Sequence, residues 1–397
     1  MSNRQMRSPR DASRIAAVVG AAGALLWVFA TRADRAGAFQ SYLFVWWFLL
    51  GISLGSLAIL MVHNLTGGGW GESIRPTLDA AARLLPWSLV LALPLLLGLH
   101  DLYAWSRPGA ADDPLLRTKA WYLNVGFFVV RNAVYFAAWL ALAHWLRRCS
   151  FARGPDASVE EKDRLRAVSA IGLLVYGVTV TFAAIDWIMS LMPQWYSTTF
   201  GLLAGIGQAL SAFSFAIVCT AWSDRVAADA KRTAGATGPK PGELASRFHD
   251  LGNLLLMFVM TWAYLAFTQY LIIWAEDLPN EIAWYLPRVE TSWRVVALGL
   301  VVFHFALPLL VLLSRRAKQA PRVLGMLAVL LLLAHLMDAW WLVVPAFRTD
   351  GVTLAATDPL AVAGLGGLWL AAFLRSAIAA RDSRPGAAPG EPLPDHG

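Results

Sequence analysis

Ten runs of apolar residues alternate with short polar segments along the chain. A helix needs about 20 residues to cross the hydrocarbon core of a membrane. Each run has that length or nearly so, and no polar segment is long enough to fold as a separate domain. The pattern therefore predicts an all-α membrane protein with ten transmembrane helices. The runs cover residues 14–31, 42–65, 84–105, 120–146, 167–191, 198–222, 250–275, 293–314, 323–345 and 358–374.

Two of these runs carry an acidic residue in similar surroundings. Asp186 is followed by Trp187 and, seven residues after the aspartate, by Pro193. Asp338 has a tryptophan close behind it, and Pro345 again follows by seven residues. A carboxylate in the middle of a membrane helix costs about 2.5–3.5 kcal/mol on insertion scales, so each aspartate needs a partner, a proton or a function.

The recurrence predicts two similar four-helix bundles. Helices two to five, residues 42–191, form the first, and helices six to nine, residues 198–345, form the second. Helices one and ten flank them, and the whole is one polytopic domain over residues 1–381. Residues 382–397 are rich in proline and glycine and are predicted to be a disordered cytoplasmic tail.

The basic residues lie mainly on one side of the predicted membrane. With ten helices, the segments on the side of both termini carry 23 Lys and Arg residues, and those on the opposite side carry 7. Cytoplasmic loops carry the excess of Lys and Arg in membrane proteins. We therefore expect both termini in the cytoplasm.

The composition agrees with this class. The chain is 58% hydrophobic and only 15% charged, whereas soluble domains have about 25% charged residues. The net charge of +7 is spread over short loops, which argues against a nucleic-acid partner. The two cysteines form no CxxC or CxxCH motif, so the chain holds no iron–sulfur cluster or c-type haem of its own.

Polar residues at membrane depth form three groups that are staggered from one side to the other. Such a series is what a proton route needs, and helix-end polarity alone would produce part of it. The outer group is His100, Asp101, Asp186 and Asp338; the central group is Arg131, His304 and His335; the inner group is His63, His144, His249 and Asp250.

Structural interpretations stand beside this one. His249 and Asp250 could cap the start of helix seven. Arg131 could neutralise one of the membrane aspartates as a buried ion pair. His304 and His335 could be core histidines bonded to backbone carbonyls, or a pair of ligands for a b-type haem. The sequence contains no Walker A motif, HExxH motif or dinucleotide-binding glycine pattern in a suitable setting.

Three segments carry a family resemblance: LAILMVHNLTGGGWG at 57–71, IDWIMSLMPQWYSTTF at 185–200 and, most specifically, the helix-seven segment at 249–287 that begins HDLGNLLLMF. They resemble the NrfD-like, polysulfide-reductase-type membrane subunits of bacterial alternative complex III, a quinol:electron-acceptor oxidoreductase. That complex has two such subunits, designated C and F. The ten helices and the chain length are more similar to the F-type protein, and the C-type protein is the second choice.

The resemblance implies two four-helix bundles in a multi-pass protein of the bacterial inner membrane. It implies partners that carry the redox centres, namely an iron–sulfur subunit and c-type cytochrome subunits, together with the paralogous NrfD-like subunit. Menaquinol or ubiquinol would be the electron source, with no cofactor bound covalently to this chain. Met192 and Gln194 stand where the C-type pattern would have an acid and a histidine, which speaks against a complete quinol pocket.

We therefore expect a membrane subunit that supplies proton acceptors and a possible quinol-facing site. Two alternatives remain open: a secondary transporter that couples ions at Asp186 and Asp338, and a purely structural scaffold for haem subunits. The candidate residues for a proton path or quinol site are Asp186, Asp338, His249, Asp250, His100, Asp101, Arg131, His304 and His335.

Overall fold

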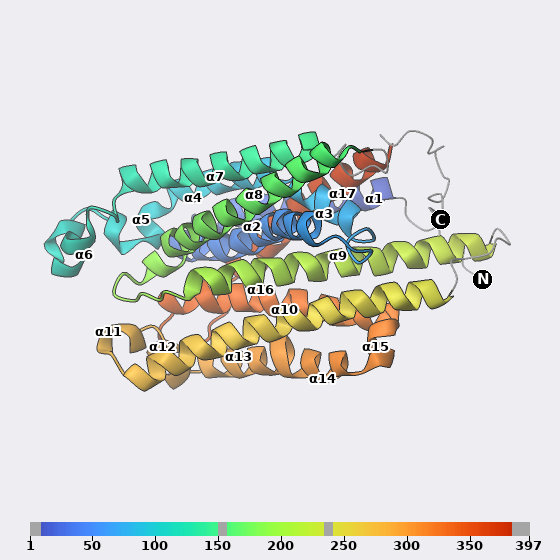
Figure 1. Ribbon diagram of the computed structural model, residues 1–397. Coiled ribbons are helices and arrows are strands. Elements are labelled where there is room, and N and C mark those ends of the chain that lie inside the picture. The colour runs from blue at the N-terminus through green and yellow to red at the C-terminus, as the bar shows by residue number, and fades with distance from the viewer. Residues whose placement is uncertain (1–8, 150–156, 234–240, 383–397) are drawn as a thin grey trace.

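The computed structural model describes residues 9–149, 157–233 and 241–382. Every regular element in these ranges is a helix, which confirms the all-α prediction. Long helices lie side by side, and short helices close the two ends of the bundle (Figure 1). The long helices are α1 (Pro9–Ala30), α2 (Arg35–Thr66), α7 (Val125–Arg148), α8 (Val159–Trp187), α9 (Phe200–Thr233), α10 (Pro241–Glu276), α16 (Pro321–Val343) and α17 (Thr357–Asp382).

Shorter helices complete the chain. Several fill the connections between the apolar runs. A π-helix at Val301–Ala306 joins α13 to α14, so that the three form one continuous span. The shorter helices are α3 (Arg75–Ala82), α4 (Leu85–Leu97), α5 (Leu99–Leu102), α6 (Pro114–Lys119), α11 (Pro279–Ile282), α12 (Leu286–Glu290), α13 (Trp293–Leu300), α14 (Leu307–Leu313) and α15 (Arg315–Gln319).

Nine helices within the described ranges are long and apolar enough to cross a membrane, and they indicate a multi-pass membrane protein. The pair α3 and α4 passes the same test together but is bent by 40° at the break between them. Pro86 stands at the start of α4, where the missing backbone N–H costs no helical hydrogen bond. A proline at this position favours a new helix start over a continuous helix.

The helix α2 is the centre of the molecule. Nearly all of it is buried, and it packs against α8 of the first predicted bundle and against α9 and α16 of the second. Small residues allow this close approach. A side chain added at Gly55 would bring its Cβ against the carbonyl oxygen of Gln208 on α9. Gly55 is therefore a point of close packing between α2 and α9.

The helices α1 and α17 form a close pair beside the rest of the bundle. Gly20 and Gly23 of α1 face Gly367 and Gly364 of α17 so closely that a Cβ at any of the four positions would meet backbone of the other helix within 3.0 Å. This contact of small residues brings together the first and last helices of the chain.

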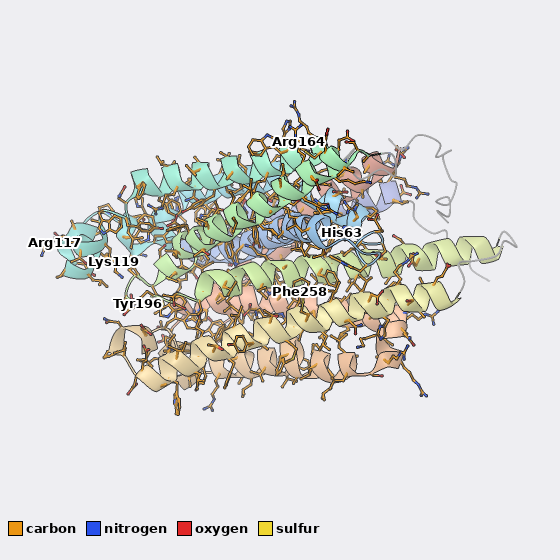
Figure 2. The ribbon with its side chains drawn as sticks, in the orientation of Figure 1. His63, Arg117, Lys119, Arg164, Tyr196 and Phe258 are labelled. Carbon is orange, nitrogen blue, oxygen red and sulfur yellow. The ribbon has the colours of Figure 1, made fainter. Side chains whose placement is uncertain are left out.

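The start of α1 and the end of α17 lie at the same end of the bundle (Figure 1). Arg10 and Asp382 are 3.5 Å apart there. The short helices α5, α6, α11 and α12 lie at the opposite end, which we call the distal end (Figure 1). Figure 2 shows Arg117 and Lys119 on α6 at the distal end and His63 nearer the termini.

The helices exceed the apolar runs in several places. The sixth run ends at residue 222 and the seventh begins at 250, whereas α9 continues to Thr233 and α10 begins at Pro241. Helical hydrogen bonding does not require an apolar sequence, so helices extend into polar surroundings. Asp382 is the last residue of α17, and the rest of the predicted tail, 383–397, lies outside the described residues.

Candidate functional site

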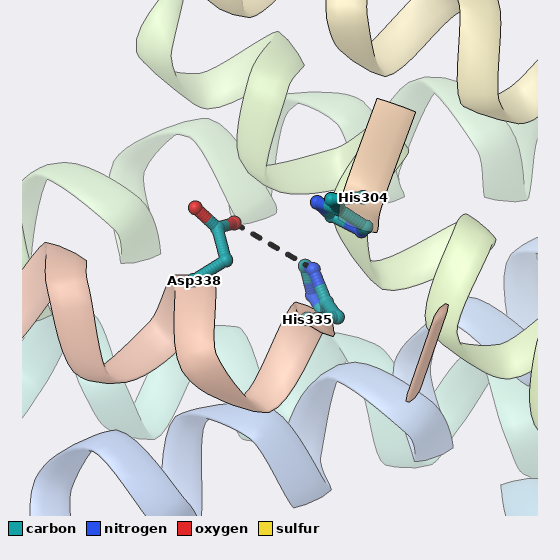
Figure 3. Close-up of side chains that lie close together, drawn as sticks. All are labelled: His304, His335 and Asp338. Atoms are coloured by element: carbon teal, nitrogen blue, oxygen red, sulfur yellow. Dashed lines mark ion pairs between the residues drawn. The ribbon is translucent and has the colours of Figure 1, made fainter. Parts of the chain in front are cut away.

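Two histidines and an aspartate meet in the interior of the second predicted bundle. His335 and Asp338 lie one turn apart on α16, and His304 lies on the π-helix between α13 and α14 (Figure 3). Nδ1 of His335 is 3.6 Å from Oδ2 of Asp338, and the two imidazole ring centres are 5.5 Å apart. All three side chains are buried. We call these residues the histidine–aspartate cluster.

The π-helix determines how His304 enters this cluster. A π-helical turn inserts an extra residue into an α-helix, and such turns often occur at functional sites. The turn directs His304 to the interior, where it is fully buried and its ring centre is 4.0 Å from that of Trp262 on α10. Neither ring nitrogen of His304 has a hydrogen-bond partner among the described residues.

The helix α9 packs against the imidazole of His335. A Cβ added at Gly207 would be 2.7 Å from Cε1 of His335, so the imidazole rests directly against the α9 backbone. Phe48 of α2 is a further neighbour, with ring centres 6.1 Å apart. Nδ1 of His335 has no hydrogen-bond partner in the described chain. The absence of a side chain at Gly207 therefore leaves room for the imidazole of His335.

The cluster consists of groups that can gain or lose a proton, and three of its four imidazole nitrogens have no hydrogen-bond partner in the described ranges. Buried polar atoms almost always have hydrogen-bond partners, so orphaned imidazole nitrogens point to a ligand, a water molecule or a proton.

The first predicted bundle holds a different arrangement around Asp186. Arg131 of α7 donates from Nε to one carboxylate oxygen at 2.9 Å and from Nη2 to the other at 2.8 Å. The hydroxyl of Tyr135, one turn along α7, donates to the same carboxylate at 2.8 Å. Asp186 is fully buried. Its charge is therefore paired and its oxygens are satisfied, as the ion-pair interpretation of Arg131 expected.

Aromatic side chains enclose this ion pair. The guanidinium of Arg131 lies 3.8 Å from the ring centre of Tyr122 and also donates to the Tyr122 carbonyl oxygen at 2.8 Å. A cation that is both paired with a carboxylate and stacked on an aromatic ring is held firmly in one geometry. Arg131, Tyr135 and Asp186, which we call the arginine–aspartate cluster, therefore have a structural role.

His100 and Asp101 lie on α5 at the distal end, apart from both clusters. Asp101 accepts a hydrogen bond from Nε of Arg35 at 2.8 Å. His100 is exposed, and its Nδ1 is 3.3 Å from the hydroxyl of Ser106. The hydrogen bond between Arg35 and Asp101 joins the start of α2 to α5.

His249 and Asp250 lie in the third turn of α10, whose first residue is Pro241. The interpretation that they cap this helix is therefore wrong, because the cap lies two turns earlier. Asp250 is exposed, and Nδ1 of His249 is 3.2 Å from the side-chain nitrogen of Asn253. Neither residue touches the histidine–aspartate cluster.

Sequence reasoning missed several partners of these groups. Tyr135 lies four residues after Arg131, a helical spacing that could have indicated it. Gly207 carries no such signal, because its importance comes from a contact between separate helices. Arg288 of α12 is fully buried and donates to the carbonyl oxygens of Trp341 and Leu342 at the end of α16, at 3.3 and 2.9 Å.

A cavity of about 150 Å³ lies between α4, α7 and the end of α8. Its polar lining residues are already engaged. The hydroxyl of Tyr103 donates to the carbonyl oxygen of Trp187 at 3.0 Å, and the amide of Asn132 donates to the carbonyl oxygen of Phe128 at 2.8 Å. The cavity therefore suits a hydrocarbon chain better than a polar head group.

No protein-family model matches the sequence, and a comparison with curated proteins finds no significant match.

Proposed function

We propose that this chain is a membrane subunit of a quinol:electron-acceptor oxidoreductase and that the histidine–aspartate cluster handles protons in it. The observation that carries the proton role is a buried cluster of two histidines and an aspartate in which three imidazole nitrogens have no hydrogen-bond partner among the described residues. The oxidoreductase role is supported by the resemblance of three sequence segments to NrfD-like subunits of alternative complex III. In this proposal the chain has ten spans, with α3 and α4 as one of them, and cytoplasmic termini in a bacterial inner membrane.

The division of labour follows from the chemistry of quinols. Oxidation of one quinol releases two protons and two electrons. The electrons pass to iron–sulfur clusters and c-type haems on partner subunits, and this chain supplies proton acceptors. Imidazoles and a carboxylate within 4.8 Å of one another can pass a proton among themselves after small side-chain movements.

The hydrogen bonds of Asp186 support Asp338 as the proton acceptor. Asp186 was expected to share this role with Asp338, but its carboxylate accepts three hydrogen bonds from Arg131 and Tyr135. An Arg guanidinium stays charged at all physiological pH values, and here it occupies both carboxylate oxygens of Asp186. Protonation of Asp186 would break this ion pair, which makes Asp338 the better proton acceptor.

The test has two stages. The chain is first purified from its native membrane through a tag, and its partners are identified by mass spectrometry and haem staining. Co-purification of an iron–sulfur protein and a c-type cytochrome supports the proposal. A chain that purifies alone and transports a solute in liposomes contradicts it and favours a secondary transporter.

The second stage measures quinol oxidation and proton release by the purified complex in liposomes. We expect Asp338→Asn to lower turnover by about 100-fold or more, the range for a lost general acid or base. Asp163→Asn is the matched control, because Asp163 is exposed near the start of α8, where it pairs with the nearby Arg166. Normal proton release in the Asp338→Asn complex would overturn the assignment of the cluster.

A further inference from the structure

The histidine–aspartate cluster also has the composition of a metal site. His304, His335 and Asp338 each offer one ligand atom, and these atoms all lie within 4.8 Å of one another. Two imidazoles and one carboxylate are a common ligand set for divalent first-row transition metals, including Zn²⁺ and Fe²⁺. The three ligands come from two separate spans, so a bound ion would join the π-helix to α16.

The surroundings of the ligands favour a cation. The only ion-pair partner of Asp338 among the described residues is His335, which carries a charge only when protonated. No Lys or Arg side chain of the described chain neutralises this carboxylate, in contrast to Asp186. Both nitrogens of the fully buried His304 lack hydrogen-bond partners in the same part of the chain. One ion bound to Asp338 and to a ring nitrogen of His304 would neutralise the carboxylate and give that nitrogen a partner.

The geometry requires only a small closure of the site. Metal–nitrogen and metal–oxygen bonds to Zn²⁺ are about 2.0–2.2 Å long, so ligand atoms on one ion lie about 3.3–3.5 Å apart. The present separations are somewhat larger, up to 4.8 Å. No hydrogen bond from the described residues restrains the imidazole of His304, so its ring can adjust to a bound ion. Gly207 and Phe48 hold His335 in place during this closure.

We propose that His304, His335 and Asp338 bind one divalent first-row transition-metal ion, for which Zn²⁺ is the probe. Three protein ligands leave a fourth position for water. Metal binding requires neutral imidazoles and an ionised carboxylate, so protons and the metal compete for the same atoms. Inhibition of proton transfer by the metal rests on the proposed function, whereas metal binding itself does not.

Binding is measured on the full chain purified in detergent through a tag without histidines. Zn²⁺ is titrated by calorimetry after treatment with a chelator, and Co²⁺ is titrated by visible absorption as a spectroscopic probe. The metal content of the untreated protein, measured by plasma mass spectrometry, distinguishes Zn²⁺ from Fe²⁺ as the native ion. None of these measurements needs quinol or partner subunits.

Two variants test the ligands, and a third serves as the control. We expect Asp338→Asn and His304→Gln each to weaken Zn²⁺ binding by about 100-fold or more, since even loss of an outer-sphere partner lowers metal affinity about 10–100-fold. His144→Gln is the matched control, because His144 is an exposed histidine on α7, and it should bind like the wild type. Equal affinity in all four proteins, or no binding by the wild type, overturns the proposal.

A measurement on the wild type alone covers the case in which a variant does not fold. X-ray absorption of the Zn²⁺-loaded protein should show two imidazole nitrogens and oxygen ligands at about 2.0–2.1 Å. A spectrum with sulfur ligands, or without imidazole, would place the ion elsewhere and contradict the proposal. If the metal binds but quinol oxidation is absent, the metal site stands and only the proposed function fails.

Discussion

Two buried aspartates, Asp186 and Asp338, lie in similar sequence frames and in opposite chemical situations. Asp186 near the end of α8 is held by both nitrogens of an arginine fork and by a tyrosine hydroxyl. Asp338 near the end of α16 faces two histidines, one of them without a hydrogen bond to any described residue. The first carboxylate has a permanent counter-charge, and the second has neighbours whose charge depends on protons or metal ions.

The difference shows that a recurring residue does not imply a recurring role. A carboxylate paired with arginine keeps its charge and stabilises one arrangement of helices. A carboxylate beside histidines can change its state, because histidine is the side chain that titrates near neutral pH. One cluster therefore suits a structural role, and the other suits exchange of protons or cations. Four substitutions test this difference between the two clusters.

The largest effect is expected from Arg131→Met. The substitution leaves Asp186 buried without its counter-charge, and loss of one partner of a buried ion pair costs about 3–5 kcal/mol. The apparent free energy of unfolding in detergent, followed by tryptophan fluorescence, measures the loss. Arg131→Met combined with Asp186→Leu removes both charges and should be more stable than Arg131→Met alone. A single variant as stable as the wild type would show that the ion pair is not structural.

A methyl group at residue 207 should disturb the other cluster. In Gly207→Ala the new Cβ would lie 2.7 Å from Cε1 of His335, so the imidazole or α9 must shift. Overpacking of this kind costs about 1–3 kcal/mol. Gly205→Ala is the control on the same helix, because its Cβ would meet its nearest neighbour, the Tyr176 hydroxyl, at 3.8 Å. Thermal unfolding should separate the two variants, and equal stability would contradict the contact.

A smaller effect is expected from Tyr135→Phe. The change removes one hydrogen bond to the Asp186 carboxylate and leaves the two from Arg131. The expected cost is about 1.5 kcal/mol in the free energy of unfolding, at the lower end of the range for a hydrogen bond to a charged group. A loss as large as that of Arg131→Met would mean that the tyrosine, rather than the arginine, determines the stability of this site.

The smallest effect concerns pH and the segment that follows Asp186. Lys119 of α6 donates to the carbonyl oxygen of Pro193 at 2.5 Å, and partial burial lowers the pKa of its amine below 10.5. Between the lowered pKa and 10.5 the unfolded chain binds more protons, so the free energy of unfolding rises with pH in that window. The gain should stay below about 1 kcal/mol because Lys119 is partly exposed.

Lys119→Met should remove this rise, which a series of thermal unfolding curves at pH 8–11 would detect. The segment after Asp338 is held instead by Arg288, which donates to the end of α16. If the wild type and Lys119→Met had the same pH dependence, burial of the Lys119 amine would have no measurable effect on stability.

Much of the architecture was predictable from the apolar runs. Helices cover all ten runs, because a chain in a membrane must satisfy its backbone hydrogen bonds internally. The third run is divided between two helices, since α4 ends at Leu97 and α5 begins at Leu99. The preceding helix α3 is bent against α4. The prolines and glycines around that run locate a break only roughly, since the bend angle depends on how neighbouring helices pack.

The clusters were predictable only in part. Their acidic and basic members stand out in apolar surroundings, because a polar side chain at membrane depth is costly. His249 and Asp250 stand out equally, yet they lie near the surface of α10. The position of a residue along one helix predicts its depth in the membrane. It does not predict which residues of other helices lie beside it.

That the protein is a bundle of apolar helices with a few buried polar residues follows from the sequence. Apolar runs of this length favour the membrane, and a chain in the membrane forms helices because their backbone hydrogen bonds are local. Tertiary structure decided which polar residues meet. Arg131 faces Asp186 because of how α7 is rotated against α8, and His304 joins His335 and Asp338 because a π-helix turns it inward. Rotation and register between helices arise from contacts such as that of Gly207, which no single segment encodes.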